Sequence, residues 1–147
     1  MRVSLLWSSP APERTIVTAM RRCYSTKPIE EIERELEQKG VEYWKFLLTK
    51  ALQDKSLDVL EHFTMTFLLT GVEPEEAGEL ALRFAHLRLT RVKGEDWLLS
   101  LNARTLLEMS RNRGVKTFVQ KAIEELDAKK VCPLFNELAF GDRVSAR

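Results

Sequence analysis

The amino-acid sequence predicts an α+β fold in which a small antiparallel sheet packs with helices. Most apolar residues recur at the three- and four-residue spacing of amphipathic helices. Residues 62–70 break this period, because apolar and polar side chains alternate there, as in a strand with one buried face. A chain of 147 residues can bury one hydrophobic core, so we expect residues 1–147 to form a single domain.

The N-terminal residues predict a short strand followed by a helix. The strand covers residues 2–8, and its apolar side chains alternate: Val3, Leu5 and Trp7. Ser9-Pro10 and Pro12-Glu13 indicate the start of a helix, because proline suits the first turn of a helix. Its expected apolar side consists of Ile16, Met20, Cys23 and Tyr24. We therefore expect Cys23 to pack in or beside the core.

Residues 28–53 predict two helices that meet at Gly40. The first begins at Pro28 and carries only a thin apolar stripe, so it is mostly exposed. Its glutamates are interpreted as a solvated face: Glu30, Glu31, Glu33, Glu35 and Glu37. The second helix covers residues 41–53. Its expected buried residues are Trp44, Leu47, Leu48 and Ala51.

The alternating segment 62–70 places His62 on its polar face, together with threonines. Its core face consists of Phe63, Met65, Phe67 and Leu69. Pro74 then starts a helix with acidic residues at its beginning and arginines at its far end, which suits the helix dipole. Those arginines are Arg83, Arg88 and Arg91. The expected buried stripe is Ala77, Leu80, Ala81, Phe84 and Leu87. His86 lies beside it, so we expect that histidine at the core boundary.

A turn at residues 93–96 and an apolar segment at 97–101 predict a further strand. Asn102 follows directly and is expected to be the N-cap of a helix over residues 103–112.

The C-terminal part predicts two more helices. The most regular amphipathic pattern follows Gly114 and consists of Val115, Phe118, Val119, Ala122, Ile123 and Leu126. Pro133 starts a last short helix, and residues 141–147 are expected to form a loose tail.

Composition argues against several classes of protein. The net charge of +1 gives no reason to expect a nucleic acid or an anionic membrane as partner. No apolar run approaches the roughly 20 residues of a membrane span. Two distant cysteines do not make a disulfide framework and suit a reducing cytoplasm. Metal-ligand spacing, a glycine-rich phosphate loop and a nucleophile–histidine–acid triad are all absent from the sequence, so we expect no metal site.

Two features could carry chemistry. His62 follows Glu61 on the polar strand face, where the alternative is an ordinary surface or capping histidine. Arg104 lies in the first turn of a helix, where a cation opposes the dipole unless it meets an anion. The backbone N–H groups of that turn could join it in binding phosphate. Arg111 and Arg113 belong to the same basic group, or are ordinary charges at a helix end.

Three segments, taken in order, resemble the flavin-dependent thymidylate synthases, also called thymidylate synthase complementing proteins. Residues 19–25 (Ala-Met-Arg-Arg-Cys-Tyr-Ser) are similar to the family's Ala-Arg-x-Cys-Tyr-Ser run after its first strand. Residues 59–67 are similar to its Glu-His followed by a Phe-Thr-Phe strand. Residues 101–107 (Leu-Asn-Ala-Arg-Thr-Leu-Leu) are similar to its Asn-Ala-Arg-Ser-Leu helix start.

The resemblance implies a set of ligands and roles. Members of the family methylate dUMP to dTMP with FAD, a reduced nicotinamide cofactor and methylenetetrahydrofolate. By position, His62, Asn102 and Arg104 would contact FAD, whereas Arg83 and Arg113 would face dUMP. The family builds its sites at the interfaces of a homotetramer, so a homo-oligomer is implied.

Departures from the family pattern concern both the nucleotide side and the flavin side of the site. Ala81, Leu82 and Arg83 stand where the family has an Arg-His-Arg triplet, and no serine follows before Trp97. Glu108 replaces an asparagine that helps to bind the flavin. We therefore expect a protein that is not catalytic alone. It would keep a flavin or nucleotide site, or associate with a full-length synthase. No catalytic residue is assigned. The alternatives are an active FAD-dependent synthase and a purely structural oligomer with a lost pocket.

Overall fold

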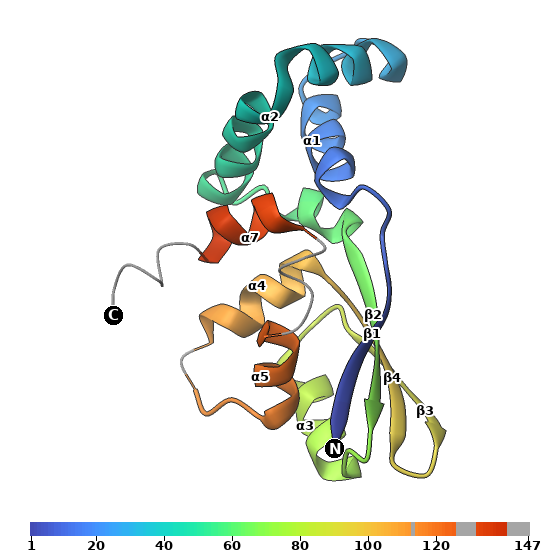
Figure 1. Cartoon of the computed structure of the whole chain (residues 1–147). Coiled ribbons are helices and arrows are strands. Elements are labelled where there is room, and N and C mark those ends of the chain that lie inside the picture. Colours follow the sequence, from blue (N-terminus) through green and yellow to red (C-terminus); the bar gives the residue numbers. More distant parts are fainter. Residues whose placement is uncertain (113, 126–131, 141–147) are drawn as a thin grey trace.

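The computed structural model describes residues 1–112, 114–125 and 132–140, and it confirms the predicted α+β class (Figure 1). Four strands form one antiparallel sheet in the order β1-β2-β4-β3. The strands are β1 (Arg2–Ser8), β2 (Thr64–Thr70), β3 (Arg88–Lys93) and β4 (Asp96–Asn102). The central strands β2 and β4 lead directly to the segments that hold the candidate site.

Some helices cover one face of the sheet, and others lie beyond its end. They are α1 (Pro12–Cys23), α2 (Ile29–Gln53), the 3-10 helix η1 (Leu57–His62), α3 (Pro74–Arg83), α4 (Ala103–Arg111), α5 (Phe118–Glu125) and α7 (Pro133–Phe140). Figure 1 shows α1 and α2 side by side at one end of the molecule, and α4 and α5 beside the sheet. None of the described helices is long and apolar enough to cross a membrane.

The core face of β2 is the one that the alternation predicted. Phe63 precedes the strand, and with Met65, Phe67 and Leu69 it is fully buried. By register, Phe67 lies between Leu5 of β1 and Leu99 of β4. The strand therefore runs through the middle of the hydrophobic core.

Strand β1 is confirmed, but its alternation breaks at Trp7. The register with β2 shifts between Leu5 and Trp7, which pairs Trp7 with Thr66. Because Thr66 lies on the face of the sheet opposite the core, this irregularity moves Trp7 out of the core and leaves it 54% exposed. A shift of one residue changes the face of every side chain beyond it, and the local sequence does not reveal such a shift.

Helix α1 begins at Pro12, the later of the two prolines that the sequence offered as a helix start, and Ile16 and Met20 are buried. The expectation for the end of its apolar side is wrong, because Cys23 and Tyr24 are exposed. Both lie at the exposed end of the helix, where the chain turns towards α2. Helical spacing alone therefore overestimated how far the buried stripe extends.

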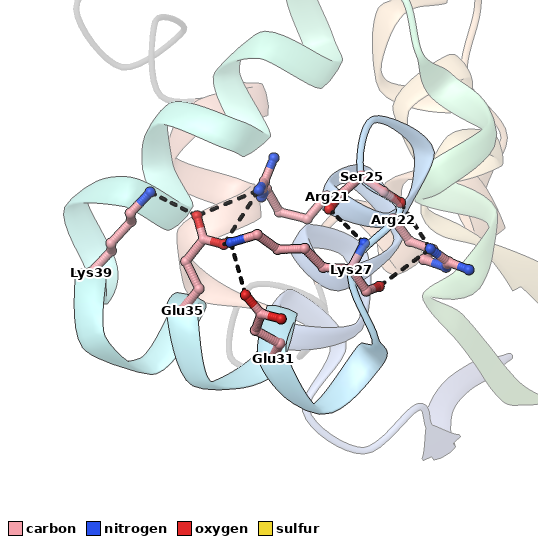
Figure 2. A network of polar contacts seen from close by, with 7 residues as sticks. All are labelled: Arg21, Arg22, Ser25, Lys27, Glu31, Glu35 and Lys39. Atoms are coloured by element: carbon pink, nitrogen blue, oxygen red, sulfur yellow. Dashed lines mark hydrogen bonds and ion pairs between the residues drawn. The ribbon is translucent and has the colours of Figure 1, made fainter.

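Helix α2 contains the break predicted at Gly40, whose φ of 70° is non-helical and costs glycine little. The prediction of a solvated glutamate face is wrong for one residue, Glu35, whose side chain is only 17% exposed. Figure 2 shows this carboxylate among cations. Lys39 donates to it at 2.8 Å, and Arg21 of α1 and Lys27 donate at 3.4 Å. Through its ion pair with Arg21, Glu35 thus connects α2 to α1.

We expect replacement of Glu35 by glutamine to destabilise the α1–α2 pair in a pH-dependent way. The hydrogen bond from Lys39, with Arg21 beside it, lowers the pKa of the Glu35 carboxyl from 4.5 to about 2. Since the folded-state pKa is the lower one, the stabilisation is complete above pH 4.5 and is lost as the pH falls towards 2. Urea melts of wild type and Glu35→Gln should therefore differ most near neutral pH and converge in acid.

A matched control for that experiment is Glu42→Gln in the same helix. The Glu42 side chain is 89% exposed, and its only ion pair within the described residues, with Lys45, spans 3.8 Å. Its substitution should be nearly neutral at every pH. Equal melts for wild type and Glu35→Gln at pH 7 would contradict the role given to Glu35.

The segment after α3 is the largest error of the sequence analysis. The helix ends at Arg83, Ala81 is exposed, and residues Arg88–Lys93 form β3 instead of a helix end with basic charges. Pairing with β4 overrides the helical spacing, because it satisfies backbone hydrogen bonds along the whole hairpin. The turn predicted at 93–96 is confirmed, and Gly94 provides its positive φ of 57°.

The C-terminal helices agree with the prediction only in part. Helix α4 starts after Asn102 as expected, but α5 starts at Phe118, and Val115 is 87% exposed. The short helix from Pro133 is confirmed. Leu126 and residues 141–147 lie outside the described residues.

Candidate functional site

The candidate site lies where η1 leads into β2 and where β4 leads into α4. Thr64 pairs with Asn102 across the two strands, and the Ala103 N–H donates to the Phe63 carbonyl at 2.9 Å. These contacts bring segment 61–64 against segment 102–104. Three of the residues that the sequence analysis selected, His62, Asn102 and Arg104, therefore belong to one junction, although about 40 residues separate His62 from Asn102.

Asn102 is the N-cap of α4, as predicted. Its side-chain oxygen accepts hydrogen bonds from the Thr105 N–H at 3.0 Å and from the Thr105 hydroxyl at 3.3 Å. Its amide nitrogen donates to no residue that the structure describes, so two N–H donors stay available at the start of the helix.

Arg104 meets anions, but both belong to this chain. Its Nη1 donates to the Glu61 carboxylate at 2.8 Å, and its Nε lies 3.7 Å from the Glu108 carboxylate. That second distance is too long for a hydrogen bond, and Nε is a buried donor without a hydrogen-bond acceptor. All three side chains are about one third exposed or more, so each ion pair contributes at most about 1 kcal/mol. The anion expected near Arg104 at the start of α4 is thus supplied by two carboxylates, Glu61 and Glu108, which bind it only weakly.

His62 does not lie on the polar face of a strand. It is the last residue of η1, its side chain is exposed, and β2 begins only at Thr64. Its carbonyl accepts a long hydrogen bond from Ser9 at 3.3 Å. The reason is simple. The alternation of apolar and polar residues already includes His62 and Phe63, but η1 extends to His62, so the predicted strand began two residues before β2.

The residues expected to face a nucleotide do not join this junction. Arg83 forms an ion pair with Glu79 and donates to the Val115 carbonyl at 2.8 Å. Its neighbours Ala81 and Leu82 are exposed, Leu82 at 90%. Arg113 lies outside the described residues. Among the residues that the structure describes, no arginine-rich cluster is therefore assembled at the end of α3.

Two residues at the junction were missed by the sequence analysis. His86 and Arg88 line an open cavity of about 310 Å³ beside Asn102. His86 was expected at the core boundary and is instead exposed. The signal that could have found this site is the hairpin pattern, in which a short alternating segment precedes the Gly94 turn and the second strand. Among the described residues, no group of three or more His, Cys, Asp or Glu side chains could hold a metal ion.

A comparison with known proteins identifies a family over the N-terminal half of the chain. A family model described as thymidylate synthase complementing protein matches residues 4–81, which are 78 of the 147 residues. The match includes His62 and ends before Arg83, Asn102 and Arg104. No curated protein matches the chain significantly.

Proposed function

Because the chain belongs to the thymidylate synthase complementing protein family, we propose that it binds a flavin cofactor but does not convert dUMP to dTMP alone. The observation that carries flavin binding is the convergence of His62, Asn102 and Arg104 at one junction. His62 lies in the matched part of the chain, whereas the roles of Asn102 and Arg104 rest on the resemblance of residues 101–107.

The residues of the junction fit the phosphate end of a flavin dinucleotide in kind. Arg104 carries a buried Nε donor without an acceptor, and Asn102 has two free amide N–H groups. Arginine and N–H donors at a helix start are the groups that proteins use for phosphate. When bound, a flavin supplies hydride transfer, which no side chain of this chain can provide. The chain's own residues hold and orient it, with Arg104 as the charged contact.

Two carboxylates oppose this binding. Glu61 and Glu108 already contact Arg104, and each would lie close to an incoming phosphate. Like charges about 4 Å apart repel by about 1 kcal/mol in water and by about 4 kcal/mol at an effective dielectric constant of 20. The cofactor must therefore displace the carboxylates from Arg104, which makes the binding weak.

The lack of unaided synthase activity follows from the end of α3. The family reaction needs a nucleotide that is held in place while charge develops during transfer. Here Ala81 and Leu82 offer no cation, and Arg83 is engaged by Glu79 and by the Val115 carbonyl. The chain also contains no serine between Arg83 and Trp97.

A flavin titration and a product assay test the proposal together. Purified protein should bind FAD with a dissociation constant in the micromolar range or weaker, and the flavin absorbance band should shift on binding. With dUMP, methylenetetrahydrofolate and a reduced nicotinamide cofactor present, no dTMP should form. Absence of FAD binding up to millimolar concentrations would reject the flavin part, and steady dTMP production would reject the non-catalytic part.

An assembly role is the second candidate, and the exposed outer face of the sheet favours it. Trp7 is 54% exposed there, and Thr66, Leu68 and Leu98 on the same face are only partly buried. Light scattering of the purified protein, alone and mixed with a full-length synthase, distinguishes the cases. A monomer that does not bind the synthase would reject assembly.

A further inference from the structure

Strand β3 is an open edge of the sheet. Among the described residues, the strand order β1-β2-β4-β3 leaves one side of β3 without a neighbouring strand, and Figure 1 shows β3 at the rim of the molecule. Every residue from Arg88 to Lys93 is exposed except Leu89, which is partly buried. An edge strand presents a row of backbone N–H and C=O groups that are not paired with another strand. The edge of β3 can therefore accept one more strand.

This edge is basic. Three of the six residues of β3 are cations, Arg88, Arg91 and Lys93, and none is acidic. Arg91 is engaged within the hairpin, because its Nε donates to the Gly94 carbonyl at 2.7 Å and its guanidinium lies over the Trp97 ring. Within the part of the chain that the structure describes, neither Arg88 nor Lys93 makes a hydrogen bond or an ion pair. Two of the three cations thus stay available to a partner.

The two available cations lie on the same face of the sheet. Arg88 pairs with Ser100, and the register shift after Arg91 places Lys93 opposite Asp96. Ser100 and Asp96 are four residues apart on β4, so they point to one face, and the residues paired with them point the same way. An added strand would meet both cations along one of its own faces.

The acidic residues beside the hairpin turn do not neutralise this edge. Asp96 accepts a hydrogen bond from the Gly71 N–H at 3.3 Å, on the side of β4 that faces away from β3. Glu95 forms no ion pair with any residue that the structure describes. The charge along β3 is therefore left for an anion from outside the chain.

The chemistry of the edge selects among possible occupants. A second copy pairing through its own β3 about a two-fold axis would bring cations opposite cations, which destabilises strand pairing. The phosphate backbone of a nucleic acid carries the matching charge, but phosphates only accept hydrogen bonds. An edge strand offers both donors and acceptors, and an extended polypeptide pairs with both.

We propose that β3 docks an acidic, extended segment of another protein, which pairs with it as a further strand of the sheet. Backbone hydrogen bonds along the edge supply affinity, and carboxylates opposite Arg88 and Lys93 supply selectivity. Leu89 lies on the other face, opposite Leu99, and offers an apolar contact there. The segment that fits best therefore alternates acidic and apolar residues. This docking does not depend on flavin binding, since the residues of the flavin junction lie outside β3.

The test titrates the full chain with short peptides and follows its backbone amide resonances. The probe is a peptide of about eight residues, long enough for a typical strand, in which glutamate alternates with valine. One comparison peptide has lysine in place of glutamate, and another has proline in place of the central valines. We expect the acidic peptide to shift the amides of β3 at millimolar concentrations. The lysine peptide should fail through charge repulsion, and the proline peptide because proline lacks the N–H that pairing needs.

Variants of the chain then identify the charged partners. Arg88→Gln and Lys93→Gln should each weaken binding of the acidic peptide by about threefold, and the double variant by about tenfold. Lys50→Gln is the matched control, because it removes an exposed cation of α2 that pairs with Asp54 at 3.6 Å, and it should leave the affinity unchanged.

Four results would overturn the proposal. They are an absence of amide shifts in β3 with the acidic peptide, equal binding of the lysine peptide, equal affinity of wild type and the double variant, and shifts caused by oligothymidylate but not by the peptide. Equal binding of the proline peptide would contradict strand pairing as its mode. Thermal melts of the variants check that the fold is retained.

Discussion

Replacing Phe67 by alanine is expected to lower the free energy of unfolding by about 3–5 kcal/mol. Phe67 is fully buried on β2, between Leu5 and Leu99 of the neighbouring strands. Its truncation removes apolar contacts and leaves a cavity that the surrounding strands cannot fill. Because small domains are stable by only about 5–15 kcal/mol, this change should shift the midpoint of urea unfolding strongly.

A control substitution tests whether the loss of stability comes from the burial of Phe67 or from the loss of any phenylalanine ring. Phe46 of α2 is 58% exposed and stacks on Tyr43. Phe46→Ala should change stability by no more than about 0.5 kcal/mol. Similar urea midpoints for Phe67→Ala and Phe46→Ala would show that β2 is not the centre of the core.

The second large effect is expected at Arg104. Replacing it by alanine should weaken FAD binding by roughly 10- to 150-fold, because a hydrogen bond to a charged group contributes about 1.5–3 kcal/mol. The fold should survive, since Arg104 is 33% exposed and contributes little through its ion pairs. Fluorescence titration of the flavin measures the affinity, and a thermal melt of the apoprotein checks the fold.

Two companion variants make that result specific. Glu108→Gln removes one of the carboxylates that compete for Arg104, so it should tighten FAD binding by about fivefold, equivalent to about 1 kcal/mol. Arg111→Ala, an exposed cation in the last turn of the same helix, should leave the affinity unchanged. If Arg104→Ala and Arg111→Ala bind FAD equally well, the flavin is not held at this junction.

Local sequence information predicted the elements whose residues carry a clear period. The alternation at 62–70 predicted the buried face of β2, and Asn102 before an apolar run predicted the N-cap of α4. Pro12, Pro28 and Pro74 marked helix starts, because proline fits a first turn and lacks the N–H that a later turn needs. These features depend on neighbours within a few residues.

The errors have a different origin. Residues 84–91 have helical spacing but form a loop and a strand, since pairing with β4 decides their conformation. Trp7 leaves the core because of a register shift against β2, and Glu35 is shielded because Arg21 comes from another helix. Each of these outcomes depends on a partner that is distant in the sequence.

The candidate site, too, was predicted in part from the sequence and decided in part by the tertiary structure. The sequence by itself selected His62 through its place beside the alternating segment and Arg104 through the conflict between a cation and the helix dipole. Asn102 joined them through the resemblance of residues 101–107 to the family's helix start. Only the tertiary structure decided that Glu61 and Glu108 already hold Arg104, and that His86 and Arg88 line a cavity beside Asn102. The physical reason is that strand pairing brings segments 61–64, 84–88 and 100–104 together, and such pairing is a property of the whole fold.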